Sequence, residues 1–290
     1  MKKYFSHFTA AYHWNIPHLN DVLEKKDVNR YQDEEVVEIT VTEQSRKYKK
    51  QNHIIHACEL PLPRGAVVWS NESFVASPEL VFLDLANNLD IHRLILLGLQ
   101  MCSHPPGNKS ESVTTKRKLS SFLEKTRGFR GHEKAEYALQ YIENGSASFM
   151  ESMAFMILTL PHKYGGFGLK GACFNYEIEF GKTYGQSLRQ KRCFVDLFYS
   201  QEKLAVEYDS FAYHHSPSAQ SKDLLRATAI ERQRIEVMRF STIQLYDEKA
   251  CREFAQNLAV RLGRRIRIRT PKFHKANNDL RDLLPSRSQE

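Results

Sequence analysis

Two acidic residues, Asp196 and Glu207, are spaced along the chain so that together they could hold a divalent cation. Residues 192–209 have the composition of two short strands joined by a tight turn at Gln201 and Glu202. In that register the numbers of facing residues sum to 403, so Asp196 lies opposite Glu207, and Asp209 falls on the same face. Like charges that face one another destabilise a sheet. A divalent cation between the carboxylates would remove that cost.

The other face of this predicted hairpin is largely apolar and suits a protein core. A shift of one residue in the pairing would place Asp196 beside Tyr208 or Val206, so the acidic face depends on a turn of even length. The residues expected on the apolar face are Val195, Leu197, Tyr199, Leu204, Val206 and Tyr208.

Three other charged residues have spacings that allow both a functional and a structural role. Asp223 and Arg226 share one face of a helix predicted over 222–234, where Arg226 could bind phosphate and Asp223 could orient it. A surface ion pair would explain the same spacing. Glu151 follows Ser148 in the Ser-x-x-Glu pattern of a capping box, and that role alone accounts for it.

Arginine alternates with isoleucine near the C-terminus, which predicts a strand over 264–269 with one core face and one basic face. Phosphate contacts from such an edge would give affinity without sequence choice. A charged edge strand that resists aggregation is the alternative. The residues expected to contact DNA are Arg192, Arg226, Arg264, Arg265, Arg267 and Arg269.

The charge is distributed unevenly along the 290 residues, whose net charge is +8. Residues 181–270 hold 17 Lys and Arg against 10 Asp and Glu, whereas residues 1–100 hold 11 against 13. The excess of positive charge therefore surrounds the acidic hairpin, which suits a site that acts on a polyanion. A generic basic surface would give the same numbers.

The five cysteines are scattered and form no CxxC pair, which indicates neither a disulfide framework nor a zinc site. No apolar run reaches the roughly 18 residues of a membrane span, and no signal peptide is recognisable. We therefore expect a cytoplasmic protein with no membrane partner. Its length and its 41% hydrophobic content predict a large core and favour two domains.

Hydrophobic periodicity predicts an α/β fold. In the first part of the chain, a helix is expected at 6–16, strands at 36–42, 54–58 and 66–70, and helices at 78–89 and 91–101. A polar linker follows at 103–118, with helices at 119–125 and 133–142. In the second part we expect a helix at 153–160, the hairpin, a helix at 222–234, strands at 237–240 and 242–245, and a helix at 247–262.

The second part resembles the PD-(D/E)XK nucleases, and among them the domains related to very-short-patch-repair endonucleases. The residues that carry the resemblance are, in order, Ser148-Phe-Met-Glu151-Ser, Arg192-x-x-x-Asp196-Leu, Val206-Glu207-Tyr-Asp209-Ser-x-x-x-His214, Asp223-Leu-Leu-Arg226 and Val237-Met-Arg239. The resemblance implies a restriction-endonuclease-like domain, a central mixed β-sheet flanked by helices, over residues 145–290.

This resemblance implies that Asp196 and Glu207 bind Mg²⁺, with Mn²⁺ as an alternative, and that Glu151 approaches the metal site. Asp209 departs from the family, which usually has lysine two residues after the glutamate. Related short-patch domains also lack that lysine and have a histidine where this chain has His214, which could act as an acid or base near neutral pH. Arg226 could supply the missing positive charge, and Asp223 could orient Arg226 or His214.

Residues 1–102 are similar to the module related to the AbiEi abortive-infection antitoxin that precedes such domains. The carriers are Ser6-His-Phe-Thr-Ala-Ala, the strand around Ile39 and Val41, and Ser77-Pro-Glu-Leu-Val-Phe-Leu-Asp84-Leu-Ala. This similarity suggests an accessory role in binding DNA or a protein partner. Residues 103–144 are then a linker with connecting helices.

Two classes of function follow from these residues. The first is a metal-dependent DNA endonuclease of repair, restriction or phage defence, and it is favoured because Asp196, Glu207 and His214 are all present. The second is a non-catalytic DNA-binding or regulatory protein, antitoxin-like, with a degenerate nuclease fold, and it is favoured by Asp209 in place of lysine. A nuclease that acts on RNA is a third reading.

Overall fold

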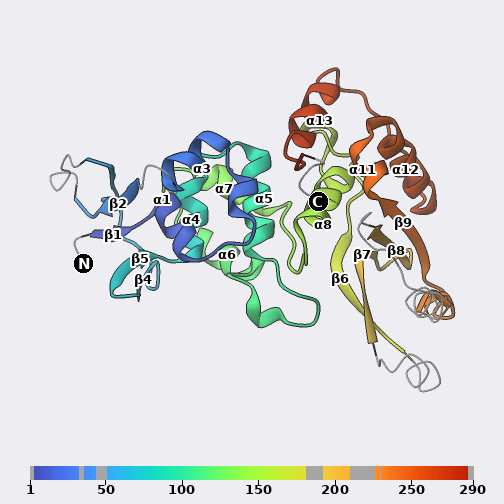
Figure 1. The fold of residues 1–290 in the computed structure, drawn as a ribbon, viewed down its shortest axis with the longest axis horizontal. Helices are drawn as coiled ribbons and strands as arrows, with labels where there is room; N and C mark the ends of the chain where they lie inside the picture. The colour runs from blue at the N-terminus through green and yellow to red at the C-terminus, as the bar shows by residue number, and fades with distance from the viewer. Residues whose placement is uncertain are drawn as a thin grey trace. The chain divides into compact units, whose positions relative to one another are not determined.

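The computed structural model describes residues 3–32, 36–43, 51–180, 192–209, 226–228 and 230–286. It is a mixed α/β structure that divides into two compact units (Figure 1). The first unit comprises Met1–Ser103 and Glu111–Asn144, and the second comprises His104–Ser110 and Gly145–Glu290. Most of the stretch 103–144, which we expected to link two domains, therefore packs as part of the first unit.

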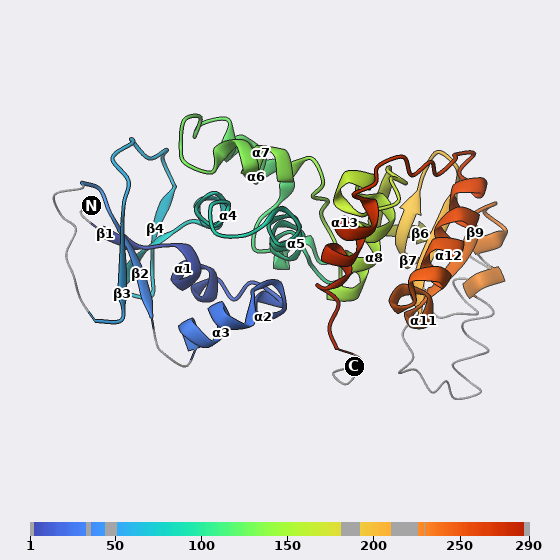
Figure 2. The same cartoon turned by 90° about the horizontal axis from the view of Figure 1, so that it is seen from above.

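The first unit contains a mixed sheet with the strand order β3-β2-β1-β5-β4. Helices α1 and α4 pack against each other and against this sheet, and Figure 2 shows them on one side of it. Two of its strands, β1 and β5, were not predicted. The strands are β1 (Lys3–Phe5), β2 (Val37–Val41), β3 (His53–Ala57), β4 (Val67–Ser70) and β5 (Ser73–Ala76).

Helices α4, α5 and α6 of the first unit begin at residues whose side chains cap them. Ser77 accepts a hydrogen bond from the Leu80 N–H, and Asp90 accepts from the N–H groups of His92 and Arg93. The residues of α5 from Leu94 to Met101 are all buried, so this helix runs through the core. The helices are α1 (His7–His13), α2 (Leu19–Val22), α3 (Lys25–Gln32), α4 (Pro78–Leu85), α5 (Ile91–Met101), α6 (Lys116–Leu123) and α7 (His132–Leu139). The short η2 (Lys109–Glu111), which follows α5, spans the boundary to the second unit.

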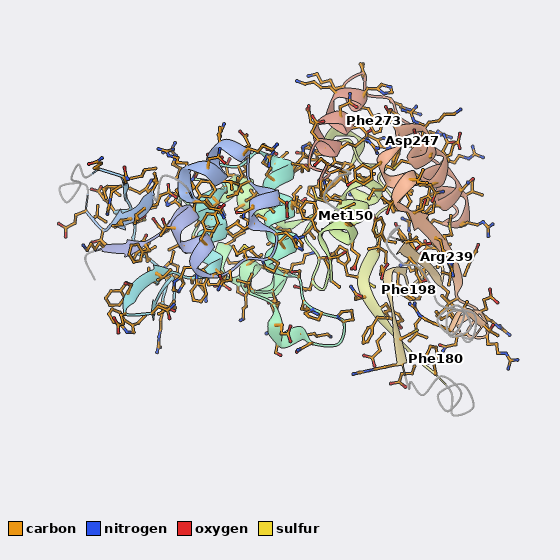
Figure 3. The ribbon with its side chains drawn as sticks, viewed as in Figure 1. Met150, Phe180, Phe198, Arg239, Asp247 and Phe273 are labelled. Atoms are coloured by element: carbon orange, nitrogen blue, oxygen red, sulfur yellow. The ribbon has the colours of Figure 1, made fainter. Side chains whose placement is uncertain are left out.

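The second unit contains a sheet with the order β6-β7-β8-β9, in which β8 and β9 are parallel and the other neighbours are antiparallel. Helix α8 packs against β7 and β8. Figure 3 shows Phe273 of α13, whose ring lies 5.8 Å from that of His162. The elements are α8 (Phe149–Thr159), η3 (His162–Tyr164), β6 (Ala172–Glu179), β7 (Arg192–Tyr199), β8 (Leu204–Asp209), β9 (Glu236–Ser241), α11 (Thr242–Tyr246), α12 (Glu248–Arg261) and α13 (Phe273–Arg281).

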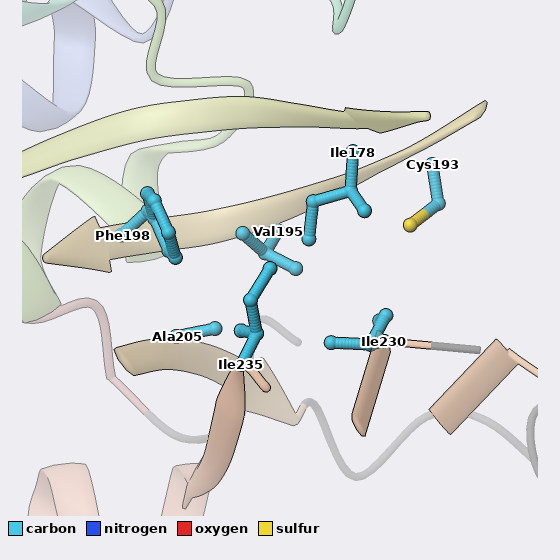
Figure 4. Close-up of a cluster of buried hydrophobic side chains, with 7 residues drawn as sticks. All are labelled: Ile178, Cys193, Val195, Phe198, Ala205, Ile230 and Ile235. Atoms are coloured by element: carbon cyan, nitrogen blue, oxygen red, sulfur yellow. The ribbon is translucent and has the colours of Figure 1, made fainter. Parts of the chain in front are cut away.

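The predicted register of the hairpin is confirmed. Leu197 pairs with Val206, and Tyr199 pairs with Leu204. Most of the face expected to be apolar is buried: Val195, Leu197, Tyr199, Leu204 and Val206 are at most 2% exposed, whereas Tyr208 is half-buried. In a cluster of buried side chains, drawn in Figure 4, residues from both strands of the hairpin pack against residues of neighbouring segments. The cluster comprises Ile178, Cys193, Val195, Phe198, Ala205, Ile230 and Ile235.

Two predictions for the C-terminal part were wrong. The segment expected as a strand at 242–245 is helix α11, because Ser241 and Gln244 form a reciprocal capping box that begins a helix there. The basic run 264–269 is not a strand. Its alternation is present, with Arg265, Arg267 and Arg269 exposed and the isoleucines half-buried, but the described chain forms no sheet there. Helix α13 was not predicted.

The capping box of α11 gives a simple test of this correction. Replacing Ser241 by alanine removes the oxygen that accepts the Gln244 N–H, and we expect the free energy of unfolding to fall by about 1 kcal/mol. Urea unfolding followed by far-ultraviolet circular dichroism would measure the change. Unchanged stability would show that this cap contributes nothing to the fold.

No helix in the described part of the chain is long and apolar enough to cross a membrane. All five cysteines are free thiols.

Candidate active site

Asp196 lies on β7 next to Leu197, the first residue of β7 in chain order that pairs with β8. Here a side chain, in place of the backbone, contacts β8. The backbone N–H of Tyr208, which follows Glu207 on β8, donates a hydrogen bond of 2.8 Å to Asp196 Oδ2. Burial, together with the nearby Glu151 and Glu207 carboxylates, raises the pKa of Asp196 to about 7. The Tyr208 hydrogen bond and Arg226 act in the opposite direction. Asp196 is therefore at the centre of a crowded acidic cluster.

Glu207 forms an ion pair with Arg226. Arg226 Nη2 lies 2.6 Å from Glu207 Oε1 and donates a second hydrogen bond of 2.7 Å to the Phe194 carbonyl oxygen. The Glu207 side chain is only 19% exposed, so solvent screens this pair weakly. Arg226 therefore holds positive charge against the acidic cluster, and it was expected both there and as a DNA contact.

Glu151 combines the two roles that its spacing allowed. Its backbone N–H donates a hydrogen bond to the Ser148 hydroxyl oxygen at the start of α8. Its Oε2 accepts hydrogen bonds from the Ala147 N–H at 2.9 Å and from Asn175 Nδ2 at 3.0 Å. Burial raises the pKa of Glu151, and its carboxylate in turn raises that of Asp196. The capping side chain is thus also part of the acidic cluster.

Asn175 is a site residue that the sequence did not reveal. Its backbone has φ of 44°, in the left-handed region, and it lies on β6 between the residues that pair with Val195 and Leu197 of β7. This position is opposite Asp196. Its amide also donates a hydrogen bond of 2.8 Å to the Gly145 carbonyl oxygen, and this bond fixes the amide beside Glu151. Asparagine tolerates this conformation better than most residues, but nothing in its spacing marks it.

Of the other predicted catalytic residues, Asp209 alone lies in the described part of the chain, and it is not part of the cluster. Asp209 is exposed at the end of β8, where it pairs with Ser241 of β9. His214 and Asp223 lie outside the described residues. In the described part of the chain, no group of three or more His, Cys, Asp or Glu side chains is arranged to hold a metal ion.

The predicted DNA-contacting arginines differ in their availability. Arg192 forms an ion pair of 3.0 Å with Glu177. Arg264 pairs with Glu202 at 2.8 Å and donates to the Lys170 carbonyl oxygen, so its guanidinium ties the hairpin turn to neighbouring loops. Arg265, Arg267 and Arg269 are exposed, and so is Arg192 despite its ion pair.

No family model, no curated protein and no solved structure matches this chain.

Proposed function

We propose that the second unit is a metal-dependent endonuclease that hydrolyses phosphodiester bonds of DNA, in repair, restriction or phage defence. The observation that supports this proposal best is the convergence of Asp196, Glu151 and Glu207, at which Asp196 has a pKa of about 7. Three carboxylates gathered with one arginine are costly for folding, and the raised pKa values of Asp196 and Glu151 are typical of a functional site.

Asp196 and Glu207 fit the proposed Mg²⁺ or Mn²⁺ by the oxygens they leave free. Among the described residues, Asp196 Oδ1 and Glu207 Oε2 have no hydrogen-bond partner. Mg²⁺ usually takes one or two carboxylates and keeps several waters, so this pair suffices as protein ligands. When bound, the ion would polarise the phosphate and favour hydroxide over water as the nucleophile.

The remaining residues would position this pair and balance its charge. The Tyr208 N–H fixes one oxygen of Asp196, and Arg226 fixes one oxygen of Glu207. Arg226 could also take over the role of the lysine that the family usually has. Its guanidinium group lies beside Glu207 and could stabilise negative charge on a phosphate bound there. The negative charge of Glu151 would raise the pKa of Asp196. The Asn175 amide, which donates a hydrogen bond to Glu151, would hold Glu151 in place.

A second candidate function is a non-catalytic DNA-binding or regulatory protein with a degenerate nuclease fold. Two observations favour it: the lysine position of the family holds the exposed Asp209, and one oxygen of Glu207 is already engaged by Arg226 at 2.6 Å. Such a protein would bind nucleic acid without cleaving it.

Cleavage assays on three substrates separate these functions. We expect the wild type to nick supercoiled plasmid with Mg²⁺ or Mn²⁺ and to lose this activity in EDTA. Binding without cleavage under either metal would support the regulatory protein instead. Cleavage of RNA, with single-stranded DNA and plasmid left intact, would identify a ribonuclease.

The Asn175 amide can be tested separately from its backbone conformation. Glycine adopts positive φ freely, so Asn175→Gly removes only the amide, whereas Asn175→Ala also forces an unfavourable backbone that costs about 1 kcal/mol. We expect both variants to cleave DNA roughly tenfold more slowly, as for other residues that orient a metal ligand set. Only the alanine variant should lose additional stability to urea. Full activity of Asn175→Gly would show that the amide has no part in the site.

A further inference from the structure

The first unit contains a polar cavity of about 410 Å³ that the proposed nuclease site does not involve. Its walls include His7 of α1, Thr40 of β2, His56 of β3 and Asp84 of α4. These residues lie where α1 and α4 pack against the sheet, a position that normally holds apolar side chains (Figure 2). The polar character of this layer therefore requires an explanation.

Asp84 is the least satisfied group in this layer. Its side chain is 18% exposed, and its Oδ2 is buried with no hydrogen-bond partner among the described residues. The nearest basic nitrogen that the structure places beside it, His7 Nδ1, is 3.8 Å from Oδ2 and thus beyond hydrogen-bond distance. Burial raises the pKa of Asp84 to about 8. A hydrogen bond from the His7 backbone N–H acts in the opposite direction, so the carboxyl group has one partner while its Oδ2 has none. A buried polar atom without a partner is costly, and perturbed ionisable groups are concentrated at binding sites.

The neighbouring His7 does not neutralise Asp84, and its ring stacks on that of His56. Their rings are stacked, with centroids 3.7 Å apart and planes 12° from parallel. Burial and the neighbouring His56 lower the pKa of His7 to about 3, so His7 is neutral at physiological pH. His7 Nδ1 lies 3.0 Å from the Ser6 hydroxyl, and His56 Nε2 lies 3.1 Å from Glu38 Oε1. The histidines are therefore engaged with other partners.

A second buried carboxylate makes the surroundings more negative. Glu38 is 1% exposed, and its other oxygen accepts the Phe8 N–H at 2.8 Å. Glu59 also lines the cavity, and Arg130, the cation among the lining residues, is exposed. Among the lining residues, the carboxyl groups of Asp84 and Glu59 thus face the guanidinium group of Arg130. The cavity is complementary to a positively charged ligand.

We propose that this cavity binds a guanidinium or ammonium group, which donates hydrogen bonds to Asp84. A guanidinium group matches a carboxylate in geometry and would donate to the part of the Asp84 carboxyl group that remains exposed, 18% of the side chain. The apolar wall, which includes Leu60, Leu83 and Phe129, would contact the aliphatic part of the ligand. A volume of about 410 Å³ is within the range of small-ligand pockets.

The charged group could belong to a free amine or to a basic side chain of a partner protein, and three probes distinguish these sources. Agmatine represents the free small molecule, and N-acetylarginine amide represents a side chain within a peptide. N-acetylcitrulline amide has nearly the same shape as the arginine probe but no charge. Each would be titrated into the full-length protein by calorimetry, and into Asp84→Asn and Glu124→Gln. Glu124 is an exposed acid at the end of α6 that does not line the cavity, so its variant is matched in charge.

We expect the wild type and Glu124→Gln to bind at least one cationic probe equally, and Asp84→Asn to bind it at least about tenfold more weakly. Binding of agmatine alone would indicate a free amine, and binding of the arginine amide would indicate a basic side chain. The proposal is overturned if neither cation binds the wild type at about 10 mM, where even weak sites fill. It is also overturned if the citrulline amide binds as tightly as the arginine amide, a comparison that needs no variant. Because the cavity belongs to the first unit, nuclease assays do not bear on this result.

Discussion

Replacing Asp196 by asparagine is expected to reduce metal-dependent DNA cleavage at least about a hundredfold, since even the residues that only orient metal ligands contribute tenfold to a hundredfold. Asparagine keeps the oxygen that accepts the Tyr208 N–H, so the fold around β7 and β8 should be retained. The lost charge removes a metal ligand at the centre of the acidic cluster. Initial rates of plasmid nicking with Mg²⁺ measure the effect.

Asp279→Asn is the matched control for this experiment. Asp279 is an exposed acid of α13 in the same unit, and its replacement changes the net charge by the same amount. We expect the control to cleave DNA at the wild-type rate. Equal rates for Asp196→Asn and the wild type would rule out Asp196 as part of a catalytic site.

The same substitution should make the metal-free protein more stable, by on the order of 2 kcal/mol at pH 8. The pKa of Asp196 is about 7 in the folded protein, against an ordinary value of 3.8 for an aspartate side chain. Between these values the folded state binds a proton that the unfolded state has released, so stability falls as the pH rises through this window. The neutral asparagine has no such dependence. Its advantage is therefore absent below pH 4, grows towards pH 7 and is complete above it.

Urea unfolding in EDTA at several pH values would measure this advantage. Both tryptophans, Trp14 and Trp69, belong to the first unit, so circular dichroism is the better signal for the second. An asparagine variant that is less stable than the wild type at pH 8 would show that Asp196 serves folding. A gain that is independent of pH would show that its ionisation is not responsible.

Features set by neighbours in the chain could be predicted from the sequence. The β7–β8 register follows from a period of two and a short turn, and Leu197 faces Val206 as expected. The capping side chains of Ser77 and Ser148 each accept a hydrogen bond from an N–H group only three residues further along the chain. In such cases a few consecutive residues determine the geometry.

Features that depend on distant segments could not be predicted. The alternation at 264–269 correctly separates exposed arginines from half-buried isoleucines, but a strand also needs a neighbouring strand, which no local pattern provides. Short strands such as β1 carry too few residues to show a period. The bend at Asn175 and the polar layer around Asp84 arise from packing between segments far apart in sequence.

The central claim is that Asp196 and Glu207 form a metal site, and calorimetric titration of Mn²⁺ into the wild type and Asp196→Asn at pH 7.5 tests it most directly. We predict one binding site in the wild type that is absent or at least about tenfold weaker in the variant, with Asp279→Asn unchanged. Equal binding by the wild type and Asp196→Asn, or no binding by the wild type, would contradict the claim.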